Sequence, residues 1–466
     1  MPKVTGGGST TPKPARTDTV AVHSTAPKAP QVGLGAQFDT DLFTSAGESK
    51  PLTPAQLSDL QAKLNRLKPQ HVRVFVKPEM LQPGPERTAL VKTLQLAQNA
   101  GASVNLTWWH GPYPADPTQR AALMTKFAGL IGDLRQKDGL TCVKDITVQN
   151  EVNSVDIAHQ NNLQASMQMY ASLYQDLDAA LKKLPDPAHP KLGVRADVRL
   201  VGGDLVEGVR KDGTRSQDDW IHFMDQHMSN VLDGYSVHIY WPPNDPQKME
   251  SRLANLQTLI VTLKHPKPLF VTEYGVKGNP GVVPGTSKPN TEPGIWDGKN
   301  VELTTASGFQ HALYNTLAPQ YGVVGSVNWA GYGTDNHTFQ GWGEIRDASA
   351  GFSTTPTYRV ERLFSNAAGK GFRANGLGRA NGETVSRFVG PSGESTVFAL
   401  NQNADARGVR ITGLKPGTSY HVTTWNADGT GALKMGTPVK VAADGTLTVQ
   451  VSSNGVVALT TAKLAL

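Results

Sequence analysis

The feature that most limits how this chain can fold is a regular alternation of short apolar segments with amphipathic segments of helical periodicity. It runs from Val32 to Phe364. One amphipathic segment opens with Thr53-Pro54, a capping residue followed by proline at the first helical position, and carries leucines along one face. Strands alternating with helices eight times predict a (β/α)8 barrel. The predicted strands are 32–38, 71–75, 103–109, 145–151, 199–203, 234–240, 268–272 and 323–328.

A change in the periodicity of the apolar residues marks a second domain. Helical periodicity disappears after the last predicted helix, and short strands follow that are separated by dipeptides such as Asn381-Gly382 and Asn454-Gly455. Such dipeptides supply the positive φ angles of tight hairpins. We therefore predict an α/β fold in which a (β/α)8 TIM barrel over 31–368 precedes a C-terminal β-sandwich over 369–466, similar in rhythm to immunoglobulin-like modules.

Composition narrows the function classes. The net charge is +6, and about half of it comes from residues 1–30, which are rich in Gly, Ser, Thr, Pro and Lys. We predict a flexible tail or linker there, with one isolated strand possible at 19–23. No run of Lys and Arg remains for nucleic-acid binding, and no apolar run is long enough to span a membrane. The single cysteine, Cys142, excludes an intramolecular disulfide.

Signals for cofactors and export are weak. Gly33-x-Gly35 lacks the third glycine of a dinucleotide site, and Asp335 and His337 lack a third metal ligand. We therefore expect no cofactor and no metal, and a monomeric protein. Residues 1–30 lack the apolar core of a signal peptide. The compartment stays open: secreted or periplasmic if a signal was removed, and cytoplasmic otherwise.

Two of the predicted strands deliver a carboxylate at their carboxyl ends. The segment Asp145–Asn153 carries Asn150 and Glu151, and the segment Pro268–Gly275 carries Glu273. In a (β/α)8 barrel all these ends open onto one mouth, so side chains far apart in sequence meet there. Two carboxyls about 5–5.5 Å apart, one a proton donor and one a nucleophile, are what retaining glycoside hydrolysis requires.

These motifs resemble those of clan A glycoside hydrolases, the superfamily containing families five, thirty, thirty-nine and seventy-nine. Gln149-Asn-Glu-Val152 and Val271-Thr-Glu-Tyr-Gly275 match its strand-four and strand-seven motifs, although many relatives have proline in place of Val152. The barrel followed by a sandwich most resembles families thirty, thirty-nine and seventy-nine. The resemblance implies a glycosidase that acts on a β-linked polysaccharide or oligosaccharide.

The resemblance also assigns roles to residues. Glu151 would be the general acid/base and Glu273 the nucleophile, while Asn150 would hold the sugar 2-hydroxyl. The acid must stay protonated while the nucleophile is charged, so their environments must push the two pKa values apart. The predicted substrate-binding residues are Arg73 and Tyr240 beside the nucleophile, Trp329 as a floor for the sugar, and Trp109, His110, Asn150 and His238 around it.

Structural roles compete with these functional ones. Arg73 can be a plain salt-bridge partner of Glu273, and His238 a satisfied core histidine. Trp108 and Trp109 cannot both face the mouth, because neighbours on a strand point to opposite sides. The alternative for the whole chain is a barrel that binds carbohydrate without cleaving it. Release of reducing sugar distinguishes the two.

Overall fold

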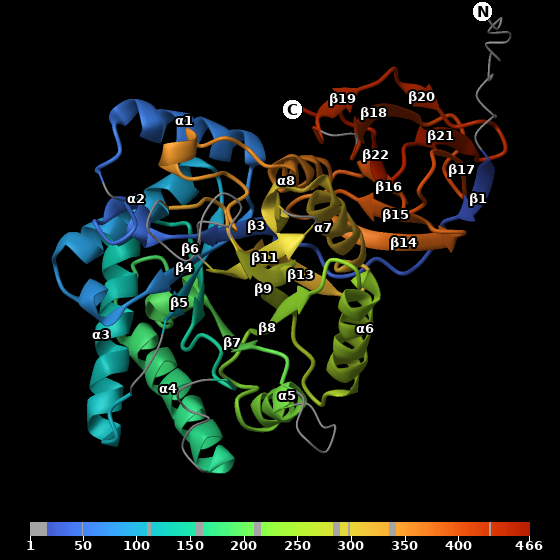
Figure 1. The fold of residues 1–466 in the computed structure, drawn as a ribbon. Coiled ribbons are helices and arrows are strands. Elements are labelled where there is room, and N and C mark those ends of the chain that lie inside the picture. The colour runs from blue at the N-terminus through green and yellow to red at the C-terminus, as the bar shows by residue number, and fades with distance from the viewer. Residues whose placement is uncertain are drawn as a thin grey trace, which may run out of the picture.

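The computed structural model of the chain describes residues 16–48, 50–109, 113–154, 162–208, 216–282, 289–296, 299–334, 342–427 and 430–466. Its larger part is a closed barrel of eight parallel strands (Figure 1), which confirms the predicted fold class. The order around the barrel is β13-β3-β4-β5-β6-β7-β8-β9. The strands are β3 (Gly33–Phe38), β4 (His71–Val76), β5 (Ser103–Trp108), β6 (Val143–Thr147), β7 (Arg199–Leu205), β8 (Gly234–Trp241), β9 (Leu269–Val276) and β13 (Val323–Asn328).

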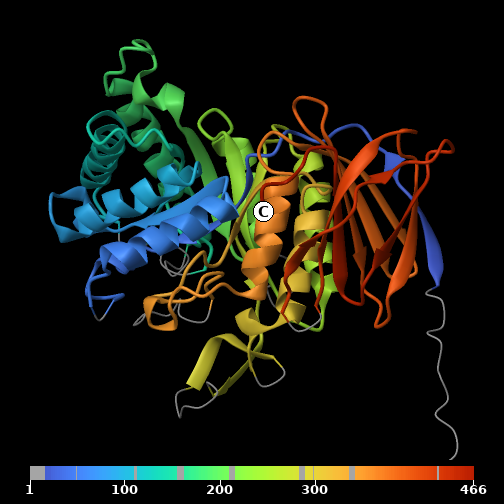
Figure 2. The same cartoon turned by 90° about the horizontal axis from the view of Figure 1, so that it is seen from above.

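Helices cover the outside of the barrel (Figure 2), and side-chain caps set where they begin. The Oγ1 atom of Thr53 accepts a hydrogen bond from the Gln56 amide at 3.2 Å, while the Gln56 side chain accepts from the Thr53 amide at 2.9 Å. The helices are α1 (Pro54–Leu67), α2 (Pro85–Asn99), α3 (Pro117–Gln136), α4 (Leu163–Lys183), α5 (Ser216–His227), α6 (Pro246–Thr262), α7 (Thr305–Leu317) and α8 (Pro356–Ala367). Short 3-10 helices are η1 (Thr40–Phe43), η2 (Pro78–Leu81), η3 (Gly193–Asp197), η4 (Val301–Leu303) and η6 (Ala348–Ala350).

The C-terminal domain is built from two β-sheets. The larger has the order β19-β18-β22-β16-β15-β14-β2, with β20 beside β18, and the smaller has the order β1-β17-β21. Asn381 and Gly382 join β14 to β15 with φ angles of 50° and 89°, as the dipeptide predicts. The strands that follow the barrel are β14 (Arg373–Ala380), β15 (Glu383–Val389), β16 (Ser395–Asn401), β17 (Arg407–Thr412), β18 (Ser419–Trp425), β19 (Leu433–Met435), β20 (Val439–Lys440), β21 (Leu447–Val451) and β22 (Gly455–Thr460).

Part of the predicted N-terminal tail belongs to this second domain. Strand β1 (Thr17–Ala21) pairs with β17 in parallel, and β2 (His23–Ser24) pairs with β14. Val20 and Val22 are buried in the sandwich core. The prediction of a flexible tail over 1–30 is therefore wrong for these strands, because alternating apolar residues there complete a sheet far away in sequence. Residues 1–15 lie outside the described part.

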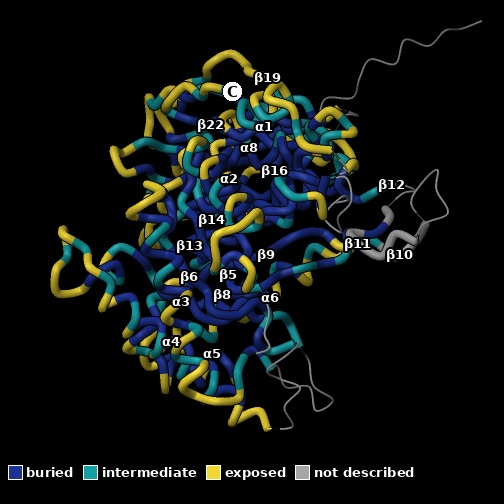
Figure 3. The backbone as a smooth tube through the Cα atoms, turned by 90° about the vertical axis from the view of Figure 1, so that its left-hand side faces the viewer, coloured by how far each residue is buried: buried dark blue, intermediate teal, exposed yellow. Residues whose placement is uncertain are grey.

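The two domains share a continuous core (Figure 3). Phe364 of α8 stacks on Phe398 of β16 with ring centroids 4.0 Å apart. Trp425 of β18 is fully buried and lies close to Gly308 of α7. Packing of this kind holds the sandwich against helices α7 and α8.

The stretch 277–300, predicted as a long loop, contains a small antiparallel sheet of β10 (Asn279–Val282), β11 (Pro289–Trp296) and β12 (Lys299–Asn300). It follows β9 and projects away from the barrel (Figure 2). Within the described residues, no helix combines the length and apolar character needed to cross a bilayer.

Candidate active site

Arg73 of β4 lies at the centre of the site and is fully buried. Its Nε donates to Thr107 Oγ1 at 2.9 Å, and its Nη1 donates to Glu273 Oε1 at 2.5 Å. Its Nη2 donates to Asn150 Oδ1 at 2.5 Å and to Asp204 Oδ2. Burial alone would lower the pKa of Arg73, but the carboxylates of Asp204 and Glu273 raise it. From β4, the charged guanidinium thus ties together side chains of β5, β7, β9 and the segment that follows β6.

Asp204 is the functional-site residue that the sequence analysis did not select. It is the second-last residue of β7, has a φ of +46°, and is fully buried. Its Oδ1 accepts from Ser236 Oγ at 2.7 Å and Thr272 Oγ1 at 2.6 Å. Burial alone would raise its pKa, but Arg73 above all holds it below the usual value. Its position after two glycines at a strand end was visible in the sequence, but no motif distinguished it.

Glu273 is held by two donors. Arg73 binds Oε1, and the hydroxyl of Tyr240 donates to Oε2 at 2.8 Å. Burial and the negative charge of Glu273 raise the pKa of Tyr240 well above its usual value, so this phenol remains a donor. Both contacts expected for the second carboxylate are present, and they fix its plane inside the mouth.

Glu151 follows β6 and faces Glu273 across an imidazole. His238 Nδ1 lies 3.1 Å from Glu151 Oε1 and 3.3 Å from Glu273 Oε2. One oxygen of Glu151 and one of Glu273 lie within 4.8 Å of each other. The Glu151 side chain is 27% exposed, whereas the Glu273 side chain is 6% exposed. The more accessible carboxyl is thus the one placed to meet a group arriving from solvent.

The directions of the pKa shifts favour His238 as the residue of this cluster that carries the proton. Burial alone would raise the pKa of Glu151, but the hydrogen bond and charge of His238, followed by the charge of Arg73, lower it. Burial alone would lower the pKa of His238, but Glu273 and Glu151 raise it. A raised pKa was expected for the acid, and the structure differs because a histidine separates the carboxylates. These directions favour an ionised Glu151 beside a protonated imidazole, an arrangement that still holds the one proton that the acid needs.

Aromatic side chains border the mouth. Phe75 packs against Trp109 with ring centroids 4.0 Å apart and against Trp329 at 5.7 Å. Trp108 is buried and packs on Phe127 of α3, at 5.3 Å, so it points toward the helices. Of the two neighbouring tryptophans, Trp109 is therefore the one on the mouth side, as its place among the predicted site residues requires.

A hollow of about 340 Å³ opens beside the carboxylates. This volume lies within the usual range for a small-molecule site. Among the lining residues, Lys277 places its Nζ atom over the ring of Tyr240, 4.9 Å from the ring centroid. The lining residues are Glu151, Val206, Glu207, His238, Tyr240 and Lys277.

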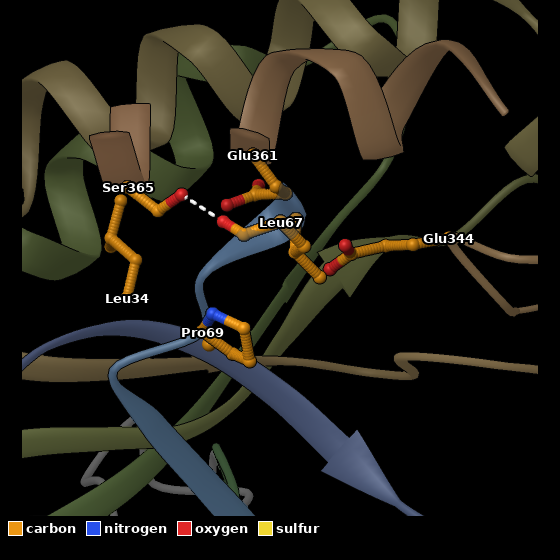
Figure 4. Close-up of a pocket in the computed structure, with 7 residues that line it drawn as sticks. Leu34, Leu67, Pro69, Glu344, Glu361 and Ser365 are labelled. Carbon is orange, nitrogen blue, oxygen red and sulfur yellow. Dashed lines mark hydrogen bonds between the residues drawn. The ribbon is translucent and has the colours of Figure 1, made fainter. Parts of the chain in front are cut away.

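A second group of buried carboxyls lies behind the barrel strands and is not a substrate site. Glu344 and Glu361 face a pocket between α1, α8 and β3 (Figure 4), but its volume of about 10 Å³ holds at most one water. Burial, with the charge of Glu361, raises the pKa of Glu344 well above the usual range. Tyr274 donates to Glu361 at 2.9 Å, so the group braces β9 from its outer face.

The remaining predicted residues have mixed outcomes. His110 lies outside the described residues, as do Asp335 and His337. Trp241 and Trp342, two further tryptophans of the described part, are buried and offer no exposed face to a sugar. The structure brings together Arg73, Asn150, Glu151, His238, Tyr240 and Glu273, with Trp109 and Trp329 at the rim.

Two groups of side chains in the described part are close enough to hold a metal ion. One is Glu151, His238 and Glu273, and the other is Asp186, His189 and Asp197 near the surface. In the first, the raised pKa of His238 favours a proton where a metal would need a neutral imidazole. In the second, Asp197 already pairs with Arg135. Neither group favours a metal over the contacts it already makes.

The fold and site define a class: barrel proteins with a C-terminal β-sandwich and two carboxylates at the ends of the fourth and seventh barrel strands. No protein-family model matches the sequence, and no curated protein sequence matches it.

Solved structures share the fold over almost the whole chain. One is a GH30 endoxylanase from Clostridium papyrosolvens C71, with a TM-score of 0.61, 15% identity, and coverage of 95% of this chain and 98% of that chain. Another is the catalytic domain of GH30 xylanase C from Talaromyces cellulolyticus. Its TM-score is 0.65 and its identity 12%, with coverage of 96% of this chain and 100% of that chain. A third is an alpha-L-arabinofuranosidase from Thermotoga maritima, solved as an arabinose complex. Its TM-score is 0.64 and its identity 12%, with coverage of 95% of this chain and 98% of that chain. Family thirty, one of those that the motifs resemble, is thus among the structural neighbours.

Proposed function

We propose that this protein is a retaining glycoside hydrolase that cleaves a β-linked polysaccharide or oligosaccharide by double displacement. One observation carries the proposal: an oxygen of Glu151 and an oxygen of Glu273 lie within 4.8 Å of each other at the mouth. Retaining enzymes hold their carboxyls about 5–5.5 Å apart, whereas inverting enzymes need about 6.5–9.5 Å to admit a water. The fold shared with xylanases and an arabinofuranosidase supports the reaction class.

In the first step Glu273 attacks the anomeric carbon while Glu151 protonates the departing glycosidic oxygen. The proton reaches Glu151 from His238 Nδ1 across the 3.1 Å contact. Arg73 and Tyr240 hold both oxygens of Glu273, so the nucleophile enters the reaction already oriented. In the second step Glu151 takes a proton from water, which hydrolyses the covalent glycosyl intermediate.

Binding would use the groups around the carboxylates. Arg73 occupies Oδ1 of Asn150, which leaves the side-chain nitrogen as a donor to a sugar hydroxyl. Trp109 and Trp329 offer apolar faces for sugar rings. The alternative, a barrel that binds carbohydrate without cleaving it, would not need two carboxylates about a protonated imidazole, and the site therefore favours the enzyme.

A panel of aryl glycosides beside a set of polysaccharides tests the proposal. We expect release of the aryl group or of reducing sugar by the wild type, and loss of all turnover in Glu273→Gln. Glu79→Gln, at an exposed position of η2, removes the same charge and should leave turnover unchanged. Binding of a glycan without release of any product would instead favour the non-catalytic alternative.

A further inference from the structure

A second hollow, of about 280 Å³, lies on the flank of the barrel and is lined by residues of α1, α8 and the beginning of β19. It belongs to the outer helices, whereas the candidate active site lies at the strand ends, so it is a separate feature of the surface. The side chains that define it are Lys63, Arg66, Tyr358, Arg359, Arg362 and Leu433.

Four cations and no carboxylate line this hollow. Lys63 and Arg66 are three residues apart on α1, and Arg359 and Arg362 are three residues apart on α8. Residues at this spacing share one face of a helix, so each helix turns two positive charges toward the same space. Like charges gathered around one hollow repel one another, which favours an anion between them.

The cations keep much of their bonding capacity. Lys63 pairs with Asp59 at 2.5 Å, and Arg359 donates to the main-chain oxygen of Thr430. Among the residues that the structure describes, neither Arg66 nor Arg362 has an acidic partner. The Nε atom of Arg362 is buried and makes no hydrogen bond to a described residue. A buried donor left without an acceptor is costly, and an oxyanion in the hollow would supply one.

The guanidinium groups of Arg66 and Arg362 both affect the hydroxyl of Tyr358. Tyr358 donates its hydroxyl to the main-chain oxygen of Lys63 at 2.8 Å, at the wall of the hollow. Burial raises the pKa of Tyr358 to about 12, and the positive charges of Arg362 and Arg66 both oppose that rise. Both charges therefore lie within electrostatic reach of this hydroxyl, from different helices.

We propose that this hollow is an oxyanion-binding site, occupied by the uronate carboxylate of an acidic glycan or by free phosphate. Planar guanidinium forks bind both groups through paired charge-assisted hydrogen bonds. The proposal of an oxyanion site depends on the cations alone. Only the choice of a glycan as the molecule that supplies the oxyanion rests on the proposed function. A glycan held here would be anchored away from the mouth, on the side where barrel and sandwich meet.

Calorimetric titration of the full-length Glu273→Gln protein tests the site without turnover. The probes are tetragalacturonate, inorganic phosphate and the neutral xylotetraose. We expect both anions to bind more weakly as salt is raised, and to lose roughly tenfold or more in affinity in the double variant Arg66→Gln/Arg362→Gln. The control Lys126→Gln/Lys183→Gln removes the same charge from exposed positions on α3 and α4 and should bind both anions unchanged.

The outcomes separate the parts of the proposal. Phosphate binding without tetragalacturonate binding supports the site and overturns the glycan as its source. Binding of neither anion at low salt, or equal losses in the two double variants, overturns the site. If the arginine double variant fails to fold, Arg66→Gln alone, at an exposed position, provides the same comparison. Since none of these readouts needs catalysis, an inactive wild type would count against the hydrolase proposal alone.

Discussion

Replacing Asp204 with asparagine should damage stability and activity together. Asp204 is fully buried and accepts hydrogen bonds from Arg73, Ser236 and Thr272. Asparagine keeps the shape but removes the charge that balances Arg73. Breaking a buried ion pair costs about 3–5 kcal/mol. Because Arg73 keeps Glu273 as a second partner, we expect the lower end, about 3 kcal/mol, in the free energy of unfolding.

Asp204→Asn should also lower kcat for glycoside hydrolysis. Arg73 holds Glu273 and Asn150, so a shift of its guanidinium moves both groups. A displacement of about 1 Å in a catalytic group costs roughly 100-fold in rate. Urea unfolding measures the stability, and aryl glycoside hydrolysis well below the unfolding transition measures kcat.

Asp145→Asn is the matched control. Asp145 is also buried on a barrel strand and accepts from Arg199 at 2.6 and 2.8 Å, and its side-chain contacts are with Arg199 and His71 rather than with the site residues. We expect it to lose stability and keep kcat. An Asp204→Asn protein with wild-type kcat, or with an unchanged free energy of unfolding, would refute the view that Asp204 anchors the site through Arg73.

Further outcomes are expected from the arrangement of the site. Glu151→Gln should spare the first step for substrates with good leaving groups and abolish it for natural ones; equal losses for both would contradict its role as acid. The raised pKa of His238 places the alkaline limb of activity above pH 6.5, and His238→Asn should move that limb. Its protonated form also stabilises the fold, fully below pH 6.5 and less as pH rises through the folded pKa, which urea unfolding at several pH values measures. Tyr240→Phe removes one hydrogen bond to a charged carboxylate and should lower kcat/KM roughly 10- to 100-fold in steady-state assays. Dialysis against EDTA should leave turnover unchanged, whereas a loss restored by a divalent ion would indicate a metal at Glu151, His238 and Glu273.

Local sequence patterns were enough to predict the strands and helices of the barrel. Apolar segments at 71–76 and 269–276 are buried strands because both faces of a barrel strand are covered, and caps such as Thr53 begin helices through contacts with neighbours in sequence. The alternation alone was therefore enough to place Glu151 and Glu273 at strand ends on one side of a barrel. The resemblance to clan A glycoside hydrolases then implied Arg73 and Tyr240 as partners of Glu273.

Contacts between distant segments decided the rest. Strand β1 joins the sandwich through pairing with β17, nearly four hundred residues away, which no local signal encodes. The raised pKa of His238 and the lowered pKa of Asp204 beside Arg73 depend on distances and desolvation, since a pKa follows from the charges and solvent around a group. The sequence by itself determined which side chains reach the mouth. Only the tertiary structure decided which of them touch, because ångström-scale separations arise from the packing of the whole barrel.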